Sequence, residues 1–338
     1  IQNKIMVSVS GGTPPALART TESVTSFINE ATIDFADYVD KDELLSQFLP
    51  SIHNYFVLND KVCSVPTDVT ANGLIYNKTA FEKAGVSVPT SPDDIWTWEE
   101  FEQALKTVME KGGVQYGLVI DNPTHRWSTI LYEFGGSLAN ENGGNLSSPE
   151  SLAAIDEGIV PKSTWLGGED PNNMFRSGQV AAHLSGNWIF INYRDNITDF
   201  EWGVTYLPTE VTRSSVPGGK QLTAFEGSGM EQEAVDFIMW VTAQEQNAQY
   251  CEESLLISPR LDNAELNYSF GSEYFAIMAN ELDNTVPEAS FDWGYPNLSA
   301  ELQTILEEGF SEVINGTMTA QELAAEADAA TNALMGKD

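Results

Sequence analysis

The chain has 338 residues, with 50 acidic residues against 16 basic ones and a formal net charge of −34. This length predicts two domains, and 42% hydrophobic with 10% aromatic residues is enough for folded cores. The negative charge argues against binding to nucleic acid or to anionic lipid, both of which need clustered Lys and Arg. A neutral ligand, a cationic ligand, or none remains.

No stretch approaches the 18 consecutive apolar residues of a membrane span. Residues 1–5 have neither the basic nor the apolar region of a signal peptide. The two cysteines, Cys63 and Cys251, are expected to be free, buried thiols, because cysteine is usually buried. A single disulfide is the alternative, since sequence does not give their separation.

Strand-like and helix-like segments alternate along the chain, which indicates an α/β fold. Short apolar runs rich in β-branched and aromatic residues predict buried strands. These runs are Val62–Val65, Leu74–Tyr76, Tyr116–Ile120, Trp202–Tyr206 and Leu222–Phe225.

Helix starts are marked by capping signals. Ser148 followed by Pro149 predicts a helix that begins there. Apolar stripes at helical spacing run from Ala234 to Val241 and from Leu302 to Phe310, and are expected to face the core. Capping boxes are predicted at Thr97 with Glu100, at Thr242 with Glu245 and at Thr319 with Glu322.

Known catalytic motifs are missing from the sequence. It has no G-x-S-x-G, H-E-x-x-H, C-x-x-C or Walker-type phosphate loop, and its three histidines share no metal-ligand spacing. We therefore expect no cofactor and no metal. The many carboxylates keep open a general acid/base pair for glycoside hydrolysis, but nothing singles one out.

Three tryptophans lie in polar, turn-like stretches. Trp188 follows Ser185-Gly186-Asn187, Trp293 lies between Phe291-Asp292 and Gly294, and Trp127 follows residues 122–126. A tryptophan on a loop can stack on the C–H face of a sugar while neighbouring amides and carboxylates bind its hydroxyls. The alternative is that these rings only fill the edges of a domain, as Trp98 and Trp240 are expected to pack within core helices.

Six stretches of the chain form one ordered set of motifs. The first is Pro66-Thr67-Asp68-Val69-Thr70-Ala71-Asn72-Gly73-Leu74-Ile75-Tyr76-Asn77-Lys78 with Phe81–Gly85. The others are Thr97–Phe101; Phe134-Gly135-Gly136; Phe175–Ala182 with Ser185–Trp188; Trp202-Gly203-Val204 with Leu207-Pro208; and Pro217-Gly218-Gly219. In this order they resemble bacterial extracellular solute-binding proteins, and more narrowly the carbohydrate-binding family of ABC importers that includes maltose-binding protein.

The resemblance implies a two-lobed periplasmic-binding-protein-like α/β fold with a hinge and an interlobe ligand cleft. Chain crossings are expected near Val69–Thr70, Gln221 and Leu266. The first lobe would then comprise residues 1–69 and 222–266, and the second residues 70–221 and 267–338. Cys63 and Cys251 would share a lobe, which keeps a disulfide possible. Family members have a strand, a helix and a second strand before the segment matching residues 4–17, so we expect part of the first lobe to be missing here.

The function implied is the substrate-binding component of an ABC transporter, which captures a sugar, expected to be an oligosaccharide, and delivers it to a membrane permease. The chain is expected to be a monomer without catalytic activity that works outside the cytoplasmic membrane, as a cell-surface lipoprotein or in the periplasm. The substrate-binding residues implied are Trp188, Trp293, Trp127, Asp68, Thr70, Gly218, Gly219, Glu22, Asn122 and Asp170.

Two other functions stay open at this point. A glycoside hydrolase would use the same aromatic platforms and carboxylates. A non-sugar solute such as a polyamine would suit the acidic charge, whereas an anion would need basic groups that the sequence does not place in the cleft.

Overall fold

The computed structural model describes residues 2–120, 124–156 and 168–337. Its contacts divide the chain into two compact units, each built from segments that are distant in sequence. Unit 1 comprises Ile1–Thr70, Pro217–Ser272 and Trp293–Asn297, and unit 2 comprises Ala71–Val216, Glu273–Asp292 and Leu298–Asp338.

The boundaries differ from two of the predicted crossings. The expected boundary at Gln221 falls instead before Pro217, because Pro217 begins a strand that belongs to unit 1. The expected boundary at Leu266 falls after Ser272. The intervening residues stay with unit 1, since the Asn267 N–H donates to Glu252 (2.7 Å) and the Tyr268 hydroxyl to the Leu256 carbonyl (2.8 Å).

Unit 1 is built on strands β1, β10 and the first part of the long strand β4 (Val65–Asn77), which continues into unit 2. Strands β1 and β10 are antiparallel, with Leu17 opposite Ala224. The elements of unit 1 besides β4 are α1 (Gln2–Ser10), β1 (Leu17–Thr20), α2 (Glu22–Ile28), η1 (Asn29–Ala31), η2 (Phe35–Asp37), α3 (Lys41–Leu45), η3 (Pro50–Tyr55), β2 (Val57–Leu58), β3 (Lys61–Val62), β10 (Pro217–Ala224), α11 (Glu231–Val241), α12 (Gln244–Ser254) and η5 (Leu261–Asn263).

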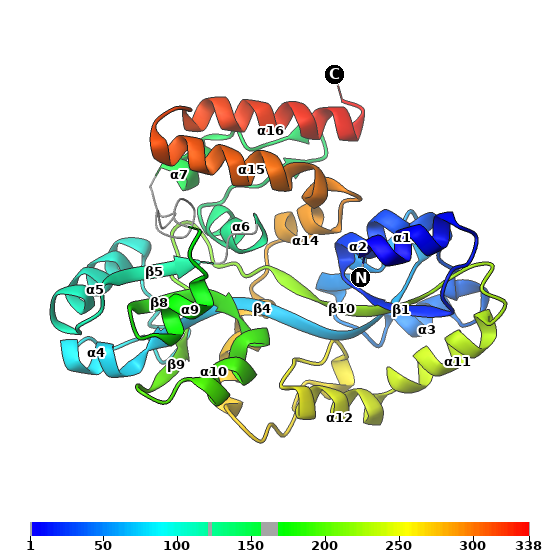
Figure 1. Ribbon diagram of the computed structural model, residues 1–338, viewed down its shortest axis with the longest axis horizontal. Coiled ribbons are helices and arrows are strands. Elements are labelled where there is room, and N and C mark those ends of the chain that lie inside the picture. The colour runs from blue at the N-terminus through cyan, green and yellow to red at the C-terminus, as the bar shows by residue number, and fades with distance from the viewer. Residues whose placement is uncertain (1, 121–123, 157–167, 338) are drawn as a thin grey trace. The chain divides into compact units, whose positions relative to one another are not determined.

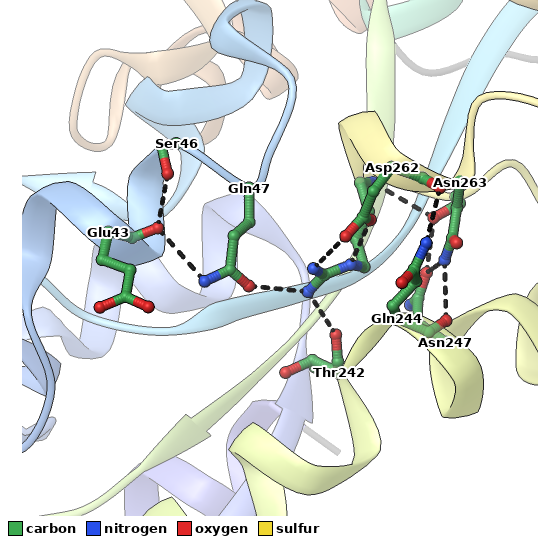
Figure 2. Close-up of polar contacts among 10 residues, drawn as sticks. Glu43, Ser46, Gln47, Thr242, Gln244, Asn247, Asp262 and Asn263 are labelled. Atoms are coloured by element: carbon green, nitrogen blue, oxygen red, sulfur yellow. Dashed lines mark hydrogen bonds and ion pairs between the residues drawn. The ribbon is translucent and has the colours of Figure 1, made fainter.

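A buried arginine joins several of these elements. Arg260, only 6% exposed, pairs with Asp262 and donates to the Gln47 side chain and the Thr242 carbonyl, all at 2.7–2.9 Å (Figure 2). A buried guanidinium needs such partners, because an unpaired charge in the interior is costly. The network fixes η5 against α3 and the α11–α12 turn.

Unit 2 has a mixed sheet in the order β9–β4–β8–β5. Strand β4 is antiparallel to β8 and β9, whereas β5 and β8 are parallel. The other elements are α4 (Lys78–Ala84), α5 (Trp98–Lys111), β5 (Tyr116–Ile120), α6 (Thr124–Glu133), β6 (Ala139–Asn140), β7 (Gly143–Gly144), α7 (Pro149–Asp156), α9 (Pro171–Arg176), β8 (Val180–Gly186), η4 (Asn187–Ile189), α10 (Phe190–Asn196), β9 (Trp202–Thr205), α13 (Ser272–Asp283), α14 (Pro287–Gly294, which straddles the boundary), α15 (Leu298–Asn315) and α16 (Ala320–Met335).

The last two helices of unit 2 pack side by side (Figure 1). Leu302, Leu306 and Phe310 of α15 are buried, as the apolar stripe predicts. Both α5 and α16 begin with the predicted capping boxes at Thr97 and Thr319. The helix predicted to begin at Pro149 is also confirmed, as α7.

Several expectations were wrong in detail. Val62–Val65 is not one strand, because β3 ends at Val62 and β4 begins at Val65. Thr242 does not cap α12, whose N-cap is Ala243. Instead, its hydroxyl donates to the Ile238 carbonyl at 2.7 Å. Trp240 is not a core residue, because 58% of it is exposed on α11. The run Leu74–Tyr76 is not a short strand of its own, but belongs to the 13-residue β4.

The two cysteines of the chain do not form a disulfide. Cys63 and Cys251 are free and buried, as their residue type predicts. Among the described residues, no helix is long and apolar enough to cross a membrane. Within the same residues, no group of three or more His, Cys, Asp or Glu side chains could hold a metal ion.

Candidate functional site

Unit 1 contains a pocket of about 250 Å³, part of it open to solvent, lined by residues of α2, η3, β4 and β10. Strand β4 contributes Pro66 and Asp68 to the pocket wall, and strand β10 contributes residues 218–221. The remaining wall comes from α2 and η3. The lining residues are Glu22, Ile52, Tyr55, Pro66, Asp68, Gly218, Gly219, Lys220 and Gln221.

Asp68 lies in this pocket wall with only 3% of its surface exposed, and its carboxylate accepts three hydrogen bonds. The Oδ2 atom accepts from Arg19 at 2.8 Å, from the Thr67 hydroxyl at 2.9 Å and from the Tyr250 hydroxyl at 3.3 Å. Arg19 also donates to the Tyr250 hydroxyl at 2.6 Å. The negative charge of Asp68 is therefore compensated within unit 1 by Arg19.

Tyr250 remains a neutral donor in this group. Burial and the neighbouring Asp68 charge raise the pKa of Tyr250 to about 12, because both disfavour a phenolate. Its hydroxyl proton is thus available to Asp68 over the physiological pH range.

Gly218 and Gly219, two of the implied substrate-binding residues, lie in strand β10. Gly219 has φ = +141°, and a Cβ atom there would lie 2.3 Å from the Asp68 carbonyl oxygen. Only glycine permits this approach of two strands. The glycine therefore keeps β10 close against β4 at the pocket wall.

Buried polar groups form the inner end of the pocket. The Gln221 amide donates to the Thr25 hydroxyl at 2.8 Å and to the Tyr55 carbonyl at 3.1 Å. The Tyr55 hydroxyl donates to the Pro217 carbonyl at 3.1 Å. These bonds hold η3 against β10. Sequence patterns gave no sign of Tyr55, Lys220 or Gln221 as pocket residues.

In unit 2, Trp188 lies in η4, directly after the buried strand β8, and is partly exposed. The Arg126 guanidinium carbon is 4.3 Å from the centroid of its ring. The Asn187 side-chain oxygen accepts from the Ala71 N–H at 3.0 Å, which fixes η4 to β4. A Cβ atom on Gly186 would lie 2.0 Å from the indole, so the Ser185–Trp188 motif needs glycine there.

The other two predicted tryptophans are not on loops. Trp127 is in α6 and fully buried, with its ring centroid 4.5 Å from that of Phe310. This packing makes Trp127 a core residue of unit 2 and not a platform for a ligand. Trp293 lies within α14 and is 8% exposed.

The remaining predicted site residues have varied positions. Glu22 lines the pocket as the first residue of α2. Thr70 is buried in β4, 8% exposed. Asp170 is the exposed N-cap of α9, where it accepts from the Asn173 N–H at 3.0 Å, so a structural role accounts for it. Asn122 lies outside the described residues.

Comparison with known proteins identifies the family. Residues 1–270 match the family described as bacterial extracellular solute-binding protein. The chain belongs to this family. A binding protein of Brucella abortus (strain 2308) is 22% identical over 281 residues, which cover 78% of this chain and 67% of that protein. The multiple sugar-binding protein of Streptococcus mutans is 24% identical over 213 residues, covering 56% of this chain and 49% of the relative.

A solved structure supports the same fold. The ABC substrate-binding protein from Listeria monocytogenes, determined in complex with cycloalternan, aligns with a TM-score of 0.81 at 21% identity and covers 99% of this chain and 89% of that one. The predicted family and the α/β fold of its members are thus confirmed. The family is described as extracellular, which indicates that this chain works outside the cytoplasm.

Proposed function

We propose that this protein captures a carbohydrate, specifically an oligosaccharide, for an ABC importer and delivers it unchanged to a membrane permease. Family membership supports the solute-binding part of this proposal. The sugar part is supported by relatives named for sugar binding and by a similar structure that holds a cyclic oligosaccharide. Ligand binding would favour a closed form over an open form by hinge motion.

The position of the Trp188 side chain is the observation that carries the sugar assignment. It is a partly exposed indole fixed at the end of a buried strand by Asn187 and Gly186. An indole face matches the apolar C–H face of a pyranose, and fixing the ring beforehand reduces the entropy lost on binding. Polar groups around Asp68 in unit 1 suit the hydroxyl groups of the same class of ligand.

The residues that we propose to contact the ligand are those that the family resemblance implies: Glu22, Asp68, Thr70, Gly218, Gly219 and Trp188. Trp293 stays in the proposal as an edge contact, whereas Trp127 and Asp170 are withdrawn because their packing and capping roles account for them.

The proposal also covers the setting in which the protein works. It acts as a monomer outside the cytoplasmic membrane, either tethered by a lipid anchor or free in a periplasm. It has no catalytic activity, so an oligosaccharide incubated with the protein is recovered intact, whereas a glycoside hydrolase would shorten it.

Calorimetric titration of a panel of neutral oligosaccharides tests the proposal. Trp188→Ala is expected to weaken binding of the best ligand by about 2 kcal/mol, or about 30-fold, without changing the fold. Trp240→Ala is the matched control, because Trp240 is an exposed tryptophan on α11 that contacts Phe237. Equal affinity of wild type and Trp188→Ala would remove Trp188 from the site. Binding of polyamines but of no sugar would refute the function.

A further inference from the structure

Lys220 lines the pocket of unit 1, and among the described residues its ammonium group has no partner. It is the fourth residue of β10 and partly buried. Its carbonyl accepts from the Thr67 hydroxyl at 3.0 Å, so the backbone is fixed. Neither a hydrogen bond nor an ion pair engages its side chain within the part of the chain that the structure describes.

The other partly buried lysines of the described chain all have oxygen partners. Lys41 pairs with Asp60, Lys61 donates to the Asn29 carbonyl at 2.8 Å and to the Thr32 carbonyl, and Lys78 pairs with Glu201 at 2.8 Å. Acidic residues outnumber basic ones by 50 to 16, so partners are abundant. Among the described residues, Lys220 is therefore the partly buried lysine whose ammonium group has no oxygen partner within the protein.

The acids of the same pocket do not cancel this charge. The Asp68 carboxylate is already paired with Arg19 at 2.8 Å. Glu22, the first residue of α2, forms no ion pair with Lys220 within the described residues. Lys220 is thus the charge in the pocket wall that is left for a ligand.

We infer that Lys220 binds an anionic group, a carboxylate or a phosphate, carried by the sugar that the pocket takes. This inference rests on the proposed function and narrows it from sugars in general to acidic ones. The sequence had disfavoured an anion for want of basic groups at the site, and Lys220 now supplies one.

The experiment compares acidic sugars with neutral counterparts of the same shape. One arm titrates uronate-containing di- and trisaccharides against their carboxyl-reduced forms, and the other titrates phosphorylated hexoses against the parent hexoses. We expect at least one acidic sugar to bind about 10- to 100-fold more tightly than its neutral partner, as for a charge-assisted hydrogen bond. The preference should shrink as salt is raised, since an open pocket is screened.

Lys220→Met keeps the length of the side chain and removes its charge, so it should abolish the preference for acidic over neutral sugars. Lys220→Arg should restore much of it. Lys111→Met is the matched control, because Lys111 is an exposed lysine at the end of α5. Circular dichroism and the melting temperature verify that each variant is folded.

The possible outcomes separate this inference from the proposed function. If neutral sugars bind as tightly as acidic ones, or if Lys220→Met keeps the preference, the inference is wrong and the function stands. If no sugar of either kind binds, both are wrong. A preference for only one arm decides between a carboxylate and a phosphate.

Discussion

Asp292 is a fully buried acid whose ionisation should make the protein less stable as the pH rises. Its Oδ2 atom accepts from the Tyr132 hydroxyl at 2.8 Å and from the Leu138 N–H at 2.7 Å, and its Oδ1 atom accepts from the Ala139 N–H at 2.9 Å. Burial outweighs these bonds and raises the pKa of Asp292 to about 7 from its ordinary value of 3.8. The carboxyl group is therefore easier to ionise in the unfolded chain.

The size of the effect follows from linkage. A pKa of about 7 in the folded chain against 3.8 in the unfolded chain corresponds to about 4 kcal/mol. Because the folded pKa is the higher one, the stabilisation is fully present below pH 3.8 and is lost as the pH rises through about 7. About 2 to 3 kcal/mol of it should disappear between pH 5 and pH 8.

Asp292→Asn isolates this contribution. The carboxamide offers only one acceptor oxygen, so the variant should be less stable than wild type by about 1 to 3 kcal/mol at pH 5. This deficit should shrink by about 2 to 3 kcal/mol at pH 8, where the wild-type carboxylate is ionised. Urea unfolding at both pH values measures the change, and Asp94→Asn, at an exposed position, is the control. A deficit that is the same at both pH values would refute the argument.

Two further variants, each with a control, test the close approach of two strands at Gly219 and the capping of α5 by Thr97. Gly219→Ala should destabilise the protein by about 3 kcal/mol in urea unfolding, because a Cβ atom would lie 2.3 Å from the Asp68 carbonyl at φ = +141°. Gly227→Ala, at φ = +76° with nothing within 4 Å, carries the strain alone and should cost about 1 kcal/mol, so equal losses would contradict the close approach. Thr97→Ala should cost about 1 kcal/mol of unfolding free energy through loss of the capping box, whereas Thr107→Ala within the same helix should cost less. Equal effects of the two threonine variants would count against a capping role.

Local signals in the sequence predicted much of the secondary structure. The capping boxes at Thr97 and Thr319 give the observed helix starts, since they depend on residues three positions apart. Strand β5 was predicted at its observed limits, Tyr116–Ile120. Strands β1 and β8 were not predicted as strands. Leu17–Thr20 lacks an apolar run, and its place is set by pairing with β10, whose paired residues lie more than two hundred positions later.

The candidate site depended more on tertiary contacts. A polar stretch before Trp127 suggested a loop, yet the residue is buried in α6 against Phe310, which comes from α15. The role of Asp170 as an N-cap was readable from the Pro171 that follows it. Asp68 was singled out by its motif, but its partners Arg19 and Tyr250 come from β1 and α12, and no spacing in the sequence connects them.

Lys220 shows why net charge and local charge must be separated. A formal charge of −34 argues against polyanions, because the negative potential of the whole surface would repel their many phosphates. A single carboxylate or phosphate on a small ligand meets instead the few groups within a Debye length, about 8 Å at physiological salt. At that range the pocket offers the ammonium group of Lys220, which has no partner among the described residues, while Asp68 is paired with Arg19. An acidic protein can therefore bind a small anion where a cation near the site is not paired with one of the protein's own carboxylates.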